Sequence, residues 1–117
     1  MGFEKFIPDR VITREGKITI LPTGVFWINA VTTKDFFQGL QRTFLLYDKE
    51  ARTIGFQPTY EREHTYVLSS SKNRHDITVS GRAFLEYYKI SYEERKSYKP
   101  TWNEKEKLVQ IDLNEPL

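Results

Sequence analysis

The chain lacks cysteine and has little histidine or methionine: among its 117 residues there is no Cys, two His and one Met. Without cysteine the protein cannot form disulfides, a thiol nucleophile, a thiolate zinc site or an iron–sulfur cluster. No run approaches the roughly 18 apolar residues that a membrane helix needs, and the N-terminus has neither the basic start nor the apolar stretch of a signal peptide. We therefore expect a soluble, cytoplasmic protein that does not associate with a membrane.

The motifs of catalysis are also missing. His64 and His75 lie in polar, turn-like surroundings, and Glu61, Glu63 and His64 do not have the spacing of a metal site. The serines at 69–71 lack the glycine frame that exposes a nucleophile, and the six glycines are too scattered to form a phosphate-binding loop. The sequence therefore predicts no enzymatic activity, no cofactor and no metal.

Aromatic residues are abundant: 8 Phe, 7 Tyr and 2 Trp make up 15% of the chain. Hydrophobic residues are 38% and charged residues 29%, which predicts a buried core under a charged surface, and the length fits one domain over 1–117. The net charge is only +2. Proteins that bind nucleic acid without sequence preference usually have a clear basic excess, so the total charge favours such binding only weakly.

The hydrophobic pattern predicts an α+β fold that is mostly β. Alternating β-branched and apolar residues indicate isolated strands, and apolar runs on either side of the polar turns 48–51 and 103–106 indicate two β-hairpins. The expected isolated strands are 3–8, which Pro8 ends at a sheet edge, 17–21, 66–69 and 76–80; the expected hairpin strands are 42–47 with 52–58, and 98–102 with 107–113.

Three short helical segments are expected between the strands. The apolar run 25–31 is interpreted as a short buried helix. Residues 32–39 are interpreted as a helical turn that Thr33 caps and Gly39 closes, or as an ordered loop. A further helix is predicted at 83–88 with Ser80 as its N-cap.

The two halves of the chain share the order strand, short helix, hairpin. Residues 18–20 correspond to 77–79 at an offset of 59, and 47–50 correspond to 102–105 at an offset of 55. This order indicates two pseudo-repeat units, at about 10–58 and 66–116. Because one unit of this size would hardly close a core alone, we expect the two units to pair within the single domain.

This layout resembles the swapped-hairpin repeat of the AbrB and MraZ group of bacterial and archaeal transcription regulators. The resemblance lies in the run Gly-Lys-Ile-Thr-Ile at 16–20, the helix expected after it, and the hairpin at 44–58. Pro22 lies one place later than in the family, and the stretch 29–39 replaces the Leu-Gly-Ile that normally ends the family helix. The resemblance implies a small swapped-hairpin-like barrel and a DNA-binding regulator of prokaryotic or viral origin. The chain is also similar to small prokaryotic and phage proteins that start with Phe-Ile-Pro.

Two basic groups, each with few acids nearby, are the candidate nucleic-acid contacts. The first group is Arg10, Arg14 and Lys17, and the second is Lys72, Arg74 and Arg82. In the family that the chain resembles, basic residues before the first strand contact DNA, which assigns that role to the first group; Arg74 precedes the matching strand of the second half. The planar fork of arginine suits phosphates and guanine edges. We expect duplex DNA as the partner, with single-stranded DNA as an alternative.

A single-strand binder would use aromatic side chains that alternate with basic ones. The tyrosines between 87 and 99 are interleaved with Lys and Arg, an arrangement typical of stacking surfaces. However, Phe84, Tyr87 and Tyr88 also fit the buried face of a helix. Both interpretations stay open at this point.

Another interpretation is a protein-interaction module, such as an adaptor or an antitoxin-like protein, or a homodimer. Its candidate residues are two aromatic pairs, Phe26 with Trp27 and Phe36 with Phe37. If exposed, these pairs would form an apolar interface; if buried, they would belong to the core.

Overall fold

The computed structural model describes residues 2–3, 15–37, 39–70 and 75–117. It contains two antiparallel five-stranded sheets and three short helical segments, so the expected mostly β, α+β class is confirmed. Apart from Phe3, the edge strand expected at 3–8 lies outside the described residues. The helical segments are α2 (Ala30–Thr32), the π-helical turn η1 (Thr33–Phe37) and α3 (Arg82–Tyr87).

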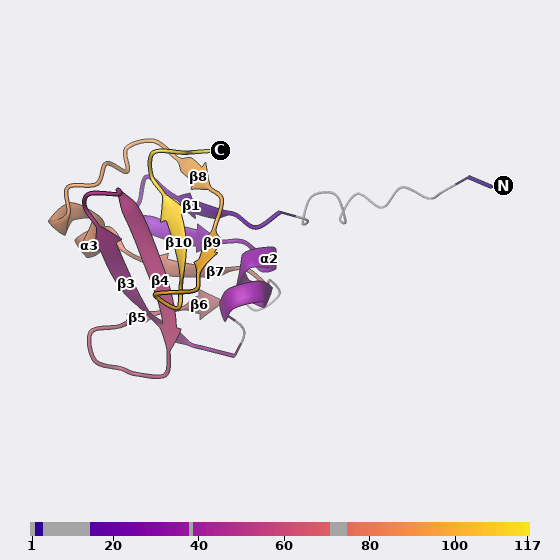
Figure 1. Cartoon of the computed structure of the whole chain (residues 1–117), viewed down its shortest axis with the longest axis horizontal. Helices are drawn as coiled ribbons and strands as arrows, with labels where there is room; N and C mark the ends of the chain where they lie inside the picture. The colour runs from indigo at the N-terminus through magenta and orange to yellow at the C-terminus, as the bar shows by residue number, and fades with distance from the viewer. Residues whose placement is uncertain (1, 4–14, 38, 71–74) are drawn as a thin grey trace.

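The strands of the two sheets cross steeply in Figure 1. Sheet 1 has the order β6-β7-β2-β1-β8, and sheet 2 has the order β5-β3-β4-β10-β9. The strands of sheet 1 are β1 (Ile18–Ile20), β2 (Val25–Ile28), β6 (Ser69–Ser70), β7 (Ile77–Ser80) and β8 (Lys96–Tyr98). Those of sheet 2 are β3 (Arg42–Asp48), β4 (Thr53–Thr59), β5 (Tyr66–Val67), β9 (Thr101–Asn103) and β10 (Leu108–Asp112).

The core lies between the sheets, because alternate residues of each central strand point inward. From sheet 1, Phe26 is fully buried and meets the ring of Phe56 from sheet 2 edge-on, with ring centroids 5.1 Å apart. Phe84 of α3 closes the same cluster at 6.4 Å from Phe26. Edge-to-face aromatic pairs of this kind contribute beyond the area that they bury.

Both expected hairpins form and have the same turn, but the first strand of the second hairpin is Thr101–Asn103 rather than 98–102, because Tyr98 belongs to β8 of sheet 1. A four-residue turn joins β3 to β4 and another joins β9 to β10. In the first, Oδ1 of Asp48 accepts a hydrogen bond from the backbone N–H of Ala51 at 3.1 Å; in the second, Oδ1 of Asn103 accepts from Glu106 at 3.0 Å. Each turn ends on a left-handed residue, Arg52 at φ 53° and Lys107 at φ 57°.

The helix expected at 25–31 is wrong, because residues 25–28 form strand β2. A tight turn returns the chain directly from β1: Gly24, at φ 85°, donates its N–H to the carbonyl of Leu21. The run Val-Phe-Trp-Ile consists of β-branched and aromatic residues, which pack well on a half-buried sheet surface. Helix begins only at Ala30, after an N-cap at Asn29.

The predicted helix caps are also wrong. Thr33 is the C-cap of α2 and the first residue of η1, and the N-cap is Asn29, whose Oδ1 accepts the capping hydrogen bond from Thr32. The helical turn expected within 32–39 is present as η1. Ser80 is the last residue of β7, paired with Val25, and the N-cap of α3 is Gly81. The predicted helix itself is confirmed within one residue at each end. Gly39 has φ 81°, as a residue that closes a helical turn requires.

The expected barrel does not close within the described residues. The predicted strand 66–69 is divided at Leu68, with β5 in sheet 2 and β6 in sheet 1. The chain also crosses between the sheets at Lys99 and Pro100, from β8 in sheet 1, which the sequence did not predict, to β9 in sheet 2. Proline has no N–H to donate, so a ladder does not continue through position 100.

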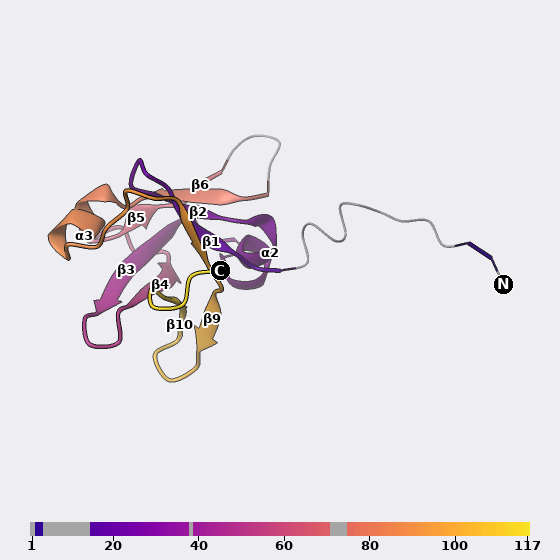
Figure 2. The same cartoon turned by 90° about the horizontal axis from the view of Figure 1, so that it is seen from above.

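Each half of the chain contributes one hairpin to each sheet. The hairpins β1–β2 and β6–β7 meet through the antiparallel pair β2–β7 at the centre of sheet 1. The hairpins β3–β4 and β9–β10 meet in the same way through β4–β10 in sheet 2. Because β2 and β7 run in opposite directions, α2 and α3 follow them at opposite ends of sheet 1 (Figures 1 and 2).

Candidate nucleic-acid interface

The two strands that follow the predicted basic groups begin at the same end of sheet 1. Both β1 and β7 pair antiparallel with β2, so they run parallel to each other. Their first residues, Ile18 and Ile77, both pair with Ile28, which places them on one row across the sheet. We call this the entry end of sheet 1.

Lys17 lies at the entry end and its backbone is fixed there. Its N–H donates both to Oδ1 of Asn29 at 3.0 Å and to Oγ1 of Thr32 at 2.9 Å. Asn29 also donates from Nδ2 to the carbonyl of Glu15 at 2.8 Å. The N-cap residue of α2 therefore ties down the segment through which the chain enters β1.

Four of the six predicted contact residues are Arg10, Arg14, Lys72 and Arg74, and they lie outside the described residues. Arg10 and Arg14 precede β1 in the chain, and Lys72 and Arg74 precede β7. What the structure establishes is that the two strands after them start on one row.

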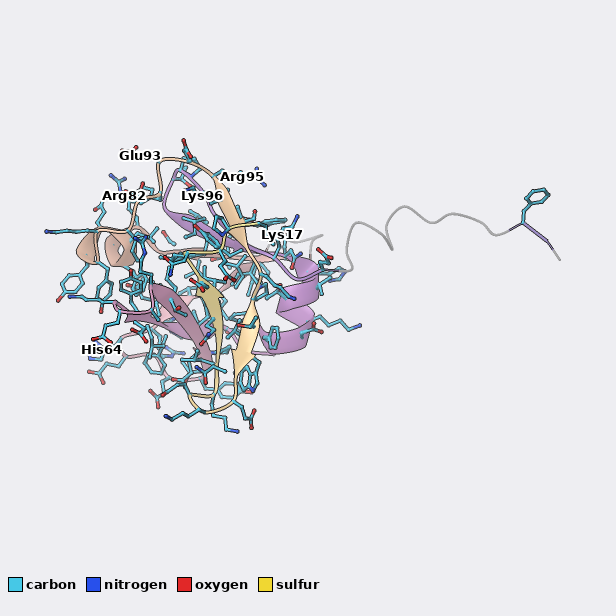
Figure 3. The ribbon with its side chains drawn as sticks, turned by 45° about the horizontal axis from the view of Figure 1, so that its top comes forward. Lys17, His64, Arg82, Glu93, Arg95 and Lys96 are labelled. Atoms are coloured by element: carbon cyan, nitrogen blue, oxygen red, sulfur yellow. The ribbon has the colours of Figure 1, made fainter. Side chains whose placement is uncertain are left out.

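Arg82 is not part of this group, because it lies at the opposite end of sheet 1. It opens α3, and a Cβ added to Gly24, in the turn that leaves β1, would stand 2.8 Å from the Cβ of Arg82. Figure 3 shows Lys17 and Arg82 far apart, and Lys96 pairs with Ile20, the last residue of β1, at the end of the sheet opposite to Lys17.

The charge of Arg82 is also engaged within the protein. Its Nε donates to Oε1 of Glu86 at 3.2 Å, and the hydroxyl of Tyr92 donates to the same oxygen at 2.8 Å. The hydrogen bond from Tyr92, followed by that from Arg82, lowers the pKa of Glu86, while the hydrogen bond to Glu86 raises the pKa of Arg82. These groups are exposed, so solvent weakens the pair.

Lys99, which the sequence analysis considered only among the lysines interleaved with tyrosines and not in the two basic groups, lies at the entry end. Lys99 follows Tyr98, which pairs with Ile18, and its side chain is exposed like that of Lys17. The sequence predicts residues 98–102 as the first strand of a hairpin, so the pairing of Tyr98 with β1 was not expected. The acids Glu15 and Asp76 lie in the same region, one before each strand.

The outer face of sheet 1 has one row of small hydroxyl side chains with a tryptophan at its centre. Residues that pair directly across the strands are Ser69, Thr78, Trp27, Thr19 and Ser97, in that order. Thr19 and Ser97 share a hydrogen bond of 2.7 Å between their hydroxyl oxygens. Two sequence signals could have revealed this row: the threonine between two isoleucines at 18–20, and the threonine between Ile77 and Val79.

The indole of Trp27 lies along the sheet. Its Nε1 donates to Oδ2 of Asp76 at 2.6 Å, although Trp27 pairs with Thr78, two residues further along β7. A side chain whose far end reaches the neighbouring strand must extend across the sheet surface. The side chain is partly exposed on this face of the sheet.

The aromatic pairs proposed for a protein interface divide between core and surface. Phe26 and Phe37 are 0% and 2% exposed and belong to the core. Trp27 is on the outer face, and half-buried Phe36 stacks on Trp102, with ring centroids 6.1 Å apart and planes within 3°. An interface of this kind would therefore rest on Trp27 and on the Phe36–Trp102 stack.

The tyrosines proposed as a stacking surface do not form one surface. Tyr98 is buried, and Tyr88 packs against Phe84 and Tyr47 with centroids 5.1 and 5.0 Å apart. Tyr92 is held by Glu86, and Tyr87 is widely exposed. Strand and helix packing therefore takes up most of the aromatic residues of this segment.

Both histidines are exposed: His64 lies between β4 and β5, whereas His75 lies at the entry end, next to Asp76. His64 is 3.6 Å from a carboxylate oxygen of its neighbour Glu63, and both side chains are open to solvent. In the described part of the chain, no three His, Cys, Asp or Glu residues gather closely enough to hold a metal ion. Among the same residues, no helix has the length and apolar character to cross a membrane.

Comparison with known proteins adds no relative: no family model matches the sequence, and no curated protein or solved structure matches the chain. The functional assignment therefore rests on the residues and geometry of the chain itself.

Proposed function

We propose that the protein is a small DNA-binding protein, a transcription regulator that acts without catalysis and binds through the entry end of sheet 1. The observation that carries the proposal is the common row on which β1 and β7 begin. The chain positions after Arg14 and after Arg74 are therefore at the same end of one sheet, with Lys17 and Lys99 beside them and the acids Glu15 and Asp76 in the same region. A cluster of cations that neutralises several phosphates binds mainly by releasing counterions, even where the net charge of the protein is small.

The proposal includes an internal duplication related to swapped-hairpin regulators. Support comes from the contribution of one hairpin per half to each sheet and from the identical turns at 48–52 and 103–107, which differ by the predicted offset of 55. In this arrangement β7 corresponds to β2. The match of β7 with β1, which the sequence suggested at an offset of 59, is therefore given up. Each pair of equivalent hairpins then forms the centre of one sheet.

The proposal is tested by comparing two triple alanine variants that remove the same charge, one from the basic group that precedes and includes Lys17 and one from cations around the opposite end of sheet 1. One variant changes Arg10, Arg14 and Lys17; the matched control changes Arg82, Arg95 and Lys96. Binding to labelled DNA is followed by fluorescence anisotropy between about 50 and 200 mM salt. We expect the first variant to lose affinity and to flatten the salt dependence by about 0.9 in logarithmic slope per phosphate contact removed. Equal losses in both variants, or no binding at low salt, would contradict the proposal.

A protein-interaction module is the second candidate, since Trp27 lies on the outer face and does not pack against the core. This function predicts a complex that tolerates salt and is abolished by Trp27→Ala in a folded variant. DNA binding through cations instead predicts a complex that dissociates as salt rises.

A further inference from the structure

We infer that the outer face of sheet 1 is a stacking platform that takes single-stranded DNA in preference to duplex, with Trp27 beneath an unpaired base. This inference rests on the proposed function, because it names the form of DNA that the same surface recognises.

The first argument is the flatness of the surface around the indole. On the row that crosses all five strands, the direct neighbours of Trp27 are Thr78 and Thr19, and the outer positions are Ser69 and Ser97. None of these side chains extends beyond its hydroxyl or methyl group. Thr19 is fully buried, so the accessible positions beside the indole are Thr78 and Ser69. With strands about 4.8 Å apart, the row from Trp27 to Ser69 is about 10 Å long, which is room for one or two nucleotides.

The second argument is the orientation of the indole. Because Nε1 donates to Oδ2 of Asp76 at 2.6 Å, the hydrogen bond fixes the direction of the indole on the sheet, and the side chain remains partly exposed there. A platform fixed before binding loses little side-chain freedom when a base stacks on it. The carboxylate also satisfies the one donor of the indole, leaving the ring to interact by stacking alone.

The third argument is the charge beside the row. Lys17 and Lys99 lie one position beyond Ile18 and Tyr98, at the entry end, where the backbone of a strand stacked on Trp27 would pass. Of the two acids in this region, Asp76 is bound to the indole, and Glu15 precedes β1. Aromatic rings flanked by cations are the usual means of binding single strands without sequence preference. Base pairs in a duplex offer only their edges in the grooves, so the indole has nothing to stack on there.

The test uses the two tryptophans of the chain as separate reporters. In Trp102→Phe, Trp27 is the sole tryptophan, and in Trp27→Phe only Trp102 remains. A thymidine-only oligonucleotide should quench the fluorescence of the first variant and leave the second unchanged. Trp27→Ala should weaken oligonucleotide binding about 5- to 150-fold, the equivalent of one lost stacking contact, while Trp102→Ala should bind like the parent.

Three outcomes separate this inference from the proposed function. Quenching of Trp27 with tighter binding of the oligonucleotide than of duplex supports both. Duplex binding that is at least as tight as oligonucleotide binding, with Trp27 unquenched, overturns the platform and leaves the proposed function standing. No binding to either DNA at low salt overturns both. Circular dichroism of each variant confirms that the comparison is made between folded proteins.

Discussion

Phe26 and Trp27 are consecutive residues of one strand, yet they belong to different parts of the molecule. Phe26 points between the sheets and touches the rings of Phe56 and Phe84, whereas Trp27 lies on the outer face, tied to Asp76. Strand alternation alone separates them. The high aromatic content of the chain therefore has two causes, filling the core on one face and forming a surface on the other.

The largest effect is expected from Phe26→Ala. The ring is fully buried at the junction of both sheets and α3, so its removal leaves a cavity that rigid neighbours cannot fill. We expect the free energy of unfolding to fall by about 3–5 kcal/mol, measured by urea denaturation. A loss below about 1 kcal/mol would show that the two sheets do not depend on this contact.

Gly81→Ala tests the same core from its edge. An added Cβ would stand 2.3 Å from Cε2 of Phe26, so the ring or the start of α3 must move. Overpacking of this kind costs about 1–3 kcal/mol. Gly39→Ala provides a contrast, since no atom lies within 4 Å of its Cβ position and any loss there reflects its φ of 81° instead. A stability equal to the parent in Gly81→Ala would contradict the packing described here.

Trp27→Ala should reduce stability by only about 1 kcal/mol, because the ring is half-buried outside the core. Its main effect should be on DNA affinity. Thermal denaturation and oligonucleotide binding, measured on the same sample, separate the two quantities. If Trp27→Ala unfolded the protein as Phe26→Ala should, the division between the two faces would be wrong.

Lys17→Ala should change stability by less than about 0.5 kcal/mol, because the side chain is exposed and the hydrogen bonds at this residue come from its backbone N–H. Its expected signature is a salt dependence of DNA binding that is less steep in logarithmic slope, by about 0.7 for single-stranded DNA and about 0.9 for duplex. Arg95→Ala at the other end of the sheet is the matched control. The same change of slope in both variants would place the DNA elsewhere.

The smallest expected effect is on the stability of the protein at acid pH. Glu86 has a pKa lowered by the hydrogen bonds from Tyr92 and Arg82, so it stabilises the folded state above its ordinary pKa of 4.5 and loses that contribution as the pH falls through the lowered value. Glu86→Gln should therefore unfold with a weaker pH dependence below 4.5 than the parent. Identical acid denaturation curves would show that the Arg82–Glu86–Tyr92 contact has no effect on stability.

Local patterns predicted the hairpins and α3 well, because their signals lie within a few residues. Polar turns between apolar runs fix both hairpins, and the alternation at 77–80 fixes β7. The run at 25–28 was misread as helix because a short apolar segment has no periodicity of its own; its strand conformation depends on pairing with β7, about 50 residues away.

The candidate site was predictable only in part, for a similar reason. Lys17 could be selected from sequence, but the common row of β1 and β7 depends on a strand that had been read as helix. Arg82 was assigned to the wrong end of sheet 1 for the same reason. Its true position, next to the turn at Gly24, could be predicted only by recognising β2 as a strand that returns from this turn. Lys99 joins the entry end through β8, a strand with one apolar residue among three and no local signal.

The most direct test of the account is the change in backbone amide chemical shifts when the labelled protein is titrated with DNA. We predict that the amides of Lys17, Trp27, Asn29 and Asp76 shift, and that those of the turns 49–52 and 104–107 in sheet 2 do not. Shifts confined to sheet 2 or to the surface around Arg82, or no shifts at low salt, would contradict the placement of the DNA at the entry end of sheet 1.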